Sequence, residues 1–216
     1  MNDGIAWSVN PCLASEYAWA AGLRGAPQFY MNTANPAPHS SHYWPASGSS
    51  DPALCRDASS VADPGCSYDY GWHTAADALT TASNATSRIA ATTHVWWLDV
   101  ETGNTWNGTH YANAADVQGS IDYLRAQGIQ AVGVYSTSYQ WGQITGGYTT
   151  NNSAAYASAW SSEFTSPNGI AGSPDWVAGA GSVSQAARYC SRSFTGVRVR
   201  LSQYPSQGFD ADYPCP

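Results

Sequence analysis

A short apolar run at residues 96–101 constrains the fold of this chain more than any other feature. The run reads Trp96-Trp97-Leu98-Asp99-Val100-Glu101 and is bounded by polar residues and glycine, which is the pattern of a buried strand. Side chains on a strand alternate between its two faces, so Asp99 and Glu101 point the same way from backbones roughly 6.5–7 Å apart. Such a pair at a strand end serves acid/base or nucleophilic chemistry, or else caps a loop and meets an arginine. The spacing alone leaves both alternatives open.

Strand-like and helical patterns alternate along the rest of the chain. This alternation predicts a parallel sheet, and its regular order favours a barrel over a doubly wound sheet. Fewer strands are predicted than the eight that a closed barrel normally needs. The length of 216 residues fits one domain, 1–216, with a long loop at about 35–67 that is rich in Pro, Ser, Ala and Asp. The predicted strands are 26–33, 95–100, 131–135, 175–178 and 197–204. The predicted helices are 11–22 with Asn10 as its N-cap, 68–81, 113–128, a helical turn around 139–145, a helix that bears Tyr156, Trp160 and Phe164, and 184–190.

The composition favours an exported protein that contacts sugars. Charged residues make up only 11% of the chain, whereas Trp and Tyr number ten and fourteen. Such a surplus suits a surface that stacks on sugar rings, although the aromatics of an exported protein can equally be core. The net charge is −7 and lysine is absent, which excludes P-loop and Schiff-base lysine chemistry and argues against a nucleic-acid partner. No apolar run reaches the length of a membrane span, so we expect no membrane contact.

Five cysteines indicate an oxidising compartment, because most of them lie in loop-like contexts. We expect Cys55 to pair with Cys66, and Cys190 with Cys215. Cys12 is then left over. No basic or long apolar segment precedes Cys12, so a signal peptide is missing and we expect the true start to lie upstream of Met1.

Two other chemistries have weak support. The pair His39 and His42 could suggest a zinc-dependent hydrolase, but no cysteine or acidic residue stands at a matching spacing. Ser136 lacks the Gly-x-Ser-x-Gly elbow of serine hydrolases. We therefore expect no metal and no cofactor.

Five short motifs, in order, resemble glycoside hydrolase family 25, the lysozyme-type muramidases with an incomplete (β/α) barrel. Residues 98–101 are similar to the family's Asp-x-Glu strand, and 134–137 to its Ile-Tyr-Thr strand. Residues 176–178 are similar to its Trp-Val-Ala strand, 203–204 to its Gln-Tyr strand, and 209–212 to its closing Val-Asp-x-Asn strand. The resemblance covers the chain from about residue 95 onwards.

Three further segments resemble a group of secreted bacterial proteins related to those hydrolases. They are 10–16, which reads Asn-Pro-Cys-Leu-Ala-Ser-Glu, 30–36, which reads Tyr-Met-Asn-Thr-Ala-Asn-Pro, and 97–103. The resemblance implies an α/β fold of the irregular TIM-like barrel type. The family carries another aspartate on its first strand, whereas Met1 here falls at the tail of the second. We therefore expect a barrel that is incomplete at its N-terminus.

Carried over by motif, the family's catalytic roles fall on three acidic residues. Glu101 is then the general acid/base, Asp99 its electrostatic partner or nucleophile, and Asp210 a third acidic group that orients water or substrate. An apolar neighbour such as Trp97 would help to keep a proton on one of the paired carboxyls. Candidate substrate-binding residues, which could equally be satisfied core residues, are Trp97, Tyr30, Asn32, Tyr135, Gln203 and Asp212.

The sequence therefore predicts a secreted or wall-associated, monomeric glycoside hydrolase. Its expected substrate is a cell-wall or extracellular polysaccharide, most of all a peptidoglycan-type glycan. The family's aromatic residue after Trp-Val-Ala is replaced by the small residues 179–181, which puts binding of the muramidase substrate in doubt. The alternative is a non-catalytic carbohydrate-binding or structural barrel derived from such an enzyme.

Overall fold

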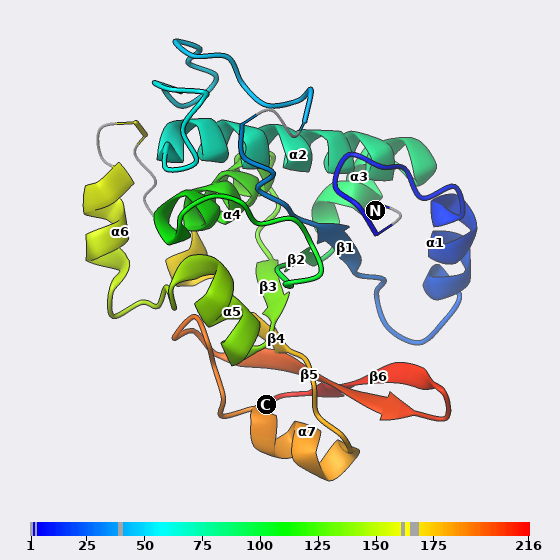
Figure 1. The fold of residues 1–216 in the computed structure, drawn as a ribbon. Helices are drawn as coiled ribbons and strands as arrows, with labels where there is room; N and C mark the ends of the chain where they lie inside the picture. Colours follow the sequence, from blue (N-terminus) through cyan, green and yellow to red (C-terminus); the bar gives the residue numbers. More distant parts are fainter. Residues whose placement is uncertain (1, 3, 39–40, 161–162, 165–168) are drawn as a thin grey trace.

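One curled, six-stranded sheet with the strand order β1-β2-β3-β4-β5-β6 organises the molecule. The structure is a computed structural model that describes residues 1–216 apart from 1, 3, 39–40, 161–162 and 165–168. Strands β1 to β5 pair in parallel, and β6 is antiparallel to β5. Figure 1 shows the sheet running through the molecule, with β5 and β6 as its last hairpin. The strands are β1 (Phe29–Asn32), β2 (Trp96–Asp99), β3 (Val132–Ser136), β4 (Asp175–Val177), β5 (Val199–Ser206) and β6 (Phe209–Pro214).

The sheet forms a half barrel, which agrees in part with the prediction of an irregular TIM-like barrel that is incomplete at its N-terminus. Within the described residues, β1 and β6 are the two edges and do not pair with each other. The last strand also departs from the repeated strand–helix unit, because a tight turn at Gln207 and Gly208 sends β6 back along β5. A mixed α/β fold is thus confirmed, whereas a complete barrel is not.

The two faces of the sheet differ in chemistry. On one face, Met31, Leu98 and Val134 lie side by side and are fully buried in the apolar core. Their neighbours along each strand point to the opposite, concave face, because side chains alternate on strands. The strand register brings Asn32 beside Asp99, and Asp99 beside Tyr135, on that face. The strand pairing therefore gathers polar side chains from separate parts of the chain.

Two long helices, α2 (Pro64–Ala85) and α4 (His110–Ala126), pack against each other beside the sheet (Figure 1). Glycines bring their backbones into contact. A Cβ atom on Gly71 would lie 2.0 Å from the carbonyl oxygen of Asp116, and one on Gly119 would lie 2.1 Å from that of Tyr68. Only glycine allows the two backbones to approach so closely. The helices are α1 (Leu13–Ala21), α2 (Pro64–Ala85), α3 (Arg88–Thr93), α4 (His110–Ala126), α5 (Ser138–Thr145), α6 (Ser153–Trp160) and α7 (Val183–Tyr189), with a 3₁₀ turn η1 (Ile170–Gly172).

Helix α2 begins earlier than the sequence predicts, so the long loop ends at residue 63 instead of 67. Asp63 is the cause, because its Oδ1 accepts a hydrogen bond of 2.9 Å from the Cys66 amide and Pro64 occupies the first helical position. Helix α4 likewise begins at His110 instead of residue 113, since Thr109 caps it. The short helix α3 was not predicted at all.

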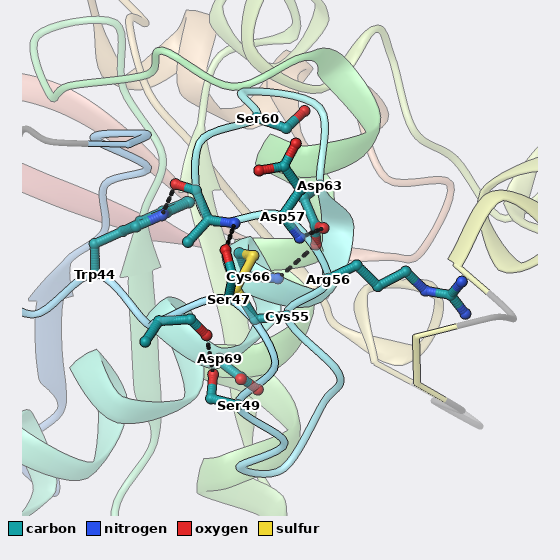
Figure 2. Close-up of a disulfide and its surroundings, with 12 residues drawn as sticks. Trp44, Ser47, Ser49, Cys55, Arg56, Asp57, Ser60, Asp63, Cys66 and Asp69 are labelled. Atoms are coloured by element: carbon teal, nitrogen blue, oxygen red, sulfur yellow. Dashed lines mark hydrogen bonds between the residues drawn. A yellow bond between two sulfur atoms is a disulfide. The ribbon is translucent and has the colours of Figure 1, made fainter.

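Both predicted disulfides are confirmed. Cys55–Cys66 joins the long loop to the first turn of α2, as Figure 2 shows. Asp63 lies beside this bridge, and its Oδ2 accepts a hydrogen bond of 2.8 Å from the Asp57 amide. Cys190–Cys215 ties the end of α7 to the residue after β6. Cys12 is free and exposed, as expected.

Among the described helices, none combines the length and the apolar character that crossing a bilayer requires.

Candidate active site

Asp99 lies at the end of β2 and anchors the polar cluster on the concave face. Only 2% of the residue is exposed. Its Oδ2 accepts hydrogen bonds from the Tyr30 hydroxyl at 2.5 Å, the Asn32 amide at 2.8 Å and the Asn104 amide at 3.4 Å. Its Oδ1 is buried and accepts no hydrogen bond from the described residues. One oxygen of this carboxyl is thus held firmly by the protein, and the other is not.

Opposing effects set the proton affinity of Asp99. Burial raises its pKa, the hydrogen bond from Tyr30 lowers it, and the charge of Glu101 raises it, with a net value of about 6. Burial and the Asp99 carboxylate in turn raise the pKa of Tyr30, which keeps that hydroxyl protonated as a donor. Asp99 can therefore change its charge close to neutral pH.

Glu101 lies two residues beyond Asp99, outside the strand, and is half-buried. Its Oε1 accepts a hydrogen bond of 3.4 Å from the Gln140 amide of α5. The same Gln140 accepts a bond of 2.6 Å from the Thr102 backbone amide through its Oε1. The Trp106 indole donates to the Glu101 carbonyl oxygen at 2.9 Å. The backbone of Glu101 is thus fixed, while its carboxylate is more open to solvent than that of Asp99.

The β5–β6 hairpin brings two more carboxylates near the pair. Asp212 pairs with Gln203 across the hairpin, and Asp210 lies two residues before Asp212 on β6. Both aspartates are exposed. The Tyr135 hydroxyl donates to Gln203 Oε1 at 2.8 Å. Burial first, and then the charges of Glu101, Asp99, Asp210 and Asp212, raise the pKa of Tyr135. Tyr135 therefore experiences the negative charge of the Asp99–Glu101 pair and that of the two aspartates on the hairpin.

Aromatic rings form the floor between these groups. Trp97 is only 2% exposed, and its indole donates to Gln28 Oε1 at 2.5 Å. Its ring covers Gly133, where an added Cβ would lie 2.2 Å from Trp97 Cζ3. Trp97 is therefore packed beneath the site. The ring that stands beside it is Trp176, half-buried, with its centroid 5.6 Å from that of Trp97 and 4.7 Å from that of Tyr135.

The sequence thus predicted most of the cluster but missed three of its members. Tyr30, Asn32, Asp99 and Tyr135 do share one face, and Gln203 joins them through Tyr135. Asn104 and Gln140 were missed because they reach the site from a loop and from a helix. Trp176 could have been predicted from the sequence, because it lies on the predicted strand 175–178. In the structure it pairs with Tyr135.

Within the described residues, no group of three or more His, Cys, Asp or Glu side chains is placed to hold a metal ion. His39 of the predicted histidine pair lies outside those residues.

Comparisons with known proteins point to the same family as the motifs. A family model described as "Lys-1: Lysozyme-like protein 1" matches residues 67–168. Residues 67–168 of this chain are thus similar to lysozyme-like proteins. Two proteins of Dictyostelium discoideum, "Probable GH family 25 lysozyme 4" and "Probable GH family 25 lysozyme 5", are 43% and 36% identical to it over 53 residues. In both cases the match spans 24% of this chain and 24% of the relative's length. No solved structure matches this chain significantly.

Proposed function

We propose that this lysozyme-like protein is a glycoside hydrolase that cleaves a cell-wall or extracellular polysaccharide, with a peptidoglycan-type glycan as its foremost substrate. The observation that carries the proposal is the pairing of a buried carboxyl, Asp99, with a half-buried one, Glu101, on the concave face. Glycosidases use two carboxyl groups in unequal environments, one to protonate the leaving oxygen and one to stabilise or attack the sugar carbon. The similarity to family 25 lysozymes supports the same reaction class.

The environments of the two carboxyls fit distinct roles. Glu101 is the more open group, with a weak hydrogen bond of 3.4 Å from Gln140, and can deliver a proton to a glycosidic oxygen. Asp99 is held by Tyr30 and Asn32 at one oxygen, which favours its charged form once the pH exceeds its pKa of about 6. We assign its Oδ1 to the positive charge that develops on the sugar. Asp210 then orients water or substrate from the hairpin.

The remaining side chains of the concave face form the proposed sugar contacts. Trp176 offers a half-buried ring beside Tyr135, and Gln203 and Asp212 offer polar groups on β5 and β6. We also propose export to the cell exterior or wall, because two disulfides are stable in oxidising compartments. A monomer is the proposed state.

The decisive experiment measures reducing ends released from peptidoglycan and from other wall glycans. Glu101→Gln should lower the rate about 10²–10⁴-fold, the usual contribution of a general acid, with an unchanged circular dichroism spectrum. Glu16→Gln is the matched control, because Glu16 lies exposed on α1 and binds Asn10. Full activity of Glu101→Gln would sink the role of Glu101. Glycan binding without any turnover by the unmodified chain would favour the non-catalytic barrel instead.

A further inference from the structure

A cavity of about 250 Å³ opens at the end of the sheet that is opposite to the acidic pair. Three of the residues that line it, Gln28, Val95 and Arg198, come directly before β1, β2 and β5. The acidic pair lies at the other, carboxyl end of β2. Trp97 also lines the cavity, so its ring separates this space from the candidate active site. The volume is small for a ligand pocket and suits a single compact group.

Two arginines supply the charge of this cavity. Arg198 and Arg200 both line it and are exposed, and within the described residues neither has an Asp or Glu side chain at ion-pair distance. Their backbones are fixed by the sheet. The Arg198 carbonyl oxygen accepts a hydrogen bond of 3.1 Å from the Asp175 amide, and that of Arg200 accepts one of 2.8 Å from the Cys215 amide. Two uncompensated positive charges therefore line one small space.

Gln28 adds an oriented neutral donor. The Trp97 indole donates to Gln28 Oε1 at 2.5 Å. Because an indole N–H can only donate, it fixes which end of the Gln28 amide is the oxygen and which is the NH2 group. Within the described residues this NH2 group has no acceptor. The cavity thus has one amide donor beside its two guanidinium groups.

The distribution of charge along the chain singles out the same region. Residues 176–209 carry four of the eight arginines and no Asp or Glu, although the net charge of the chain is −7. Two of these arginines, Arg188 and Arg192, flank Cys190, whose disulfide joins the end of α7 to Cys215 at the cavity. Figure 1 shows α7 beside the C-terminus. A local excess of positive charge in an otherwise acidic molecule attracts anions to this end of the sheet.

The set of donors matches phosphate better than carboxylate. A guanidinium group binds either anion through paired N–H bonds. A carboxylate has two coplanar oxygens and one charge, so a single arginine can satisfy it. A phosphate monoester has three terminal oxygens in a tetrahedral arrangement and close to two negative charges at neutral pH. Two arginines and an amide donor, which reach the cavity from two separate strands, fit that shape and charge.

We propose that the Gln28–Arg198–Arg200 cavity binds the phosphate group of a phosphorylated sugar. The two arginines hold the terminal oxygens, and the Gln28 NH2 group completes the set of donors. This site lies apart from Asp99 and Glu101 and needs no chemistry from them. The proposal therefore goes beyond the hydrolase function and does not rest on it.

The test measures binding of glucose 6-phosphate to the full chain by titration calorimetry at low ionic strength. Arg198→Gln and Arg200→Gln should each weaken binding about tenfold or more, as expected for the loss of charge-assisted hydrogen bonds. Arg24→Gln is the matched control, because Arg24 is exposed, lies outside the cavity and carries the same charge. Gln28→Glu should abolish binding, since its carboxylate still accepts from the Trp97 indole but repels phosphate.

Further ligands identify what the cavity recognises. Glucose should not bind, and glucuronate and inorganic phosphate should bind more weakly than glucose 6-phosphate. Equal affinities of Arg200→Gln and Arg24→Gln for glucose 6-phosphate, or no binding to the unmodified chain, would overturn the site. Glucuronate that binds as tightly would overturn the preference for phosphate, and inorganic phosphate that binds as tightly would overturn the sugar as its carrier. The release of reducing ends from glycans enters none of these outcomes, so the two proposals can fail separately.

Discussion

The pKa of Asp99 is set by neighbours that act in opposite directions. Burial and the charge of Glu101 raise its pKa, while hydrogen bonds from Tyr30 and Asn104 lower it, and the result is about 6. Among these donors, the Tyr30 hydroxyl makes the shortest contact with Oδ2, at 2.5 Å. One phenol oxygen therefore controls much of the charge state of the candidate site.

Tyr30→Phe should raise the pKa of Asp99 by about one unit, because a donor to the charged form is lost while burial remains. A ¹³C NMR titration of the aspartate carboxyls measures this shift. If Asp99 must be charged for turnover, the acid limb of kcat/KM should move upward by the same amount. Tyr135→Phe is the control, since its hydroxyl donates to Gln203 and not to Asp99. An Asp99 titration that stays near pH 6 in Tyr30→Phe would contradict this account.

Gly133→Ala tests the packing of the Trp97 ring over Gly133, because it adds a single carbon atom between them. The added Cβ would lie 2.2 Å from Trp97 Cζ3 and 2.8 Å from the Pro174 carbonyl oxygen. We expect a loss of about 1–3 kcal/mol in the free energy of unfolding, as is usual for overpacking, measured by urea denaturation. Gly142→Ala should have the opposite sign, a gain of about 0.5–1 kcal/mol, because it lies in α5 with nothing within 4 Å. Equal effects of the two substitutions would refute this packing.

At the scale of elements, the sequence predicted what local patterns encode. Strand-like apolar runs predicted β1 to β4, the alternation of Val and Arg predicted β5, and the alternation of side chains placed Asp99 and Glu101 together. Helix α3 was missed because six residues are too few to show a helical period. Strand β6 was predicted only through the family resemblance of residues 209–212, because it is mostly exposed and is held in place by pairing with β5 and by the Cys190–Cys215 bridge. Contacts of that kind, like the reach of Gln140 from α5 to Glu101, depend on distant residues and have no local signal.

The start of α2 depends on one carboxylate that serves two segments. Asp63 accepts from the Cys66 amide in the helix and from the Asp57 amide in the loop. Asp63→Ala should lower the free energy of unfolding by about 1–2 kcal/mol, the usual cost of losing an N-cap. Asp63→Asn should recover the helix cap but not the loop contact, since its one amide oxygen can accept from Cys66 while its NH2 group cannot accept from the Asp57 amide. Thermal unfolding with the disulfide intact compares the variants, and an Asn variant as unstable as Ala would argue against the capping role.

The whole molecule carries several buried carboxyls whose pKa is raised. Burial raises the pKa of Asp69 to about 7 and that of Asp175 to about 6, and it raises that of Asp116 well above its usual range. Asp99 behaves similarly, at about 6. They lie in different parts of the fold, so their effects on stability should add. The folded chain therefore binds more protons than the unfolded chain at mildly acidic pH.

This proton excess gives the pH dependence of stability a definite sign. A carboxyl whose pKa is raised on folding stabilises the folded state fully below its unfolded value of 3.8, and this contribution is lost as the pH rises through about 6 to 7. The midpoint of thermal unfolding should therefore fall by a few degrees between pH 5 and pH 8. Asp69→Asn should flatten that slope, because it removes the group with a pKa of about 7. Asp57→Asn should leave it unchanged, since Asp57 is exposed and its pKa is lowered. Calorimetric scans at four pH values measure all three chains, and a midpoint that rises towards pH 8 would mean that these carboxyls are not buried as described.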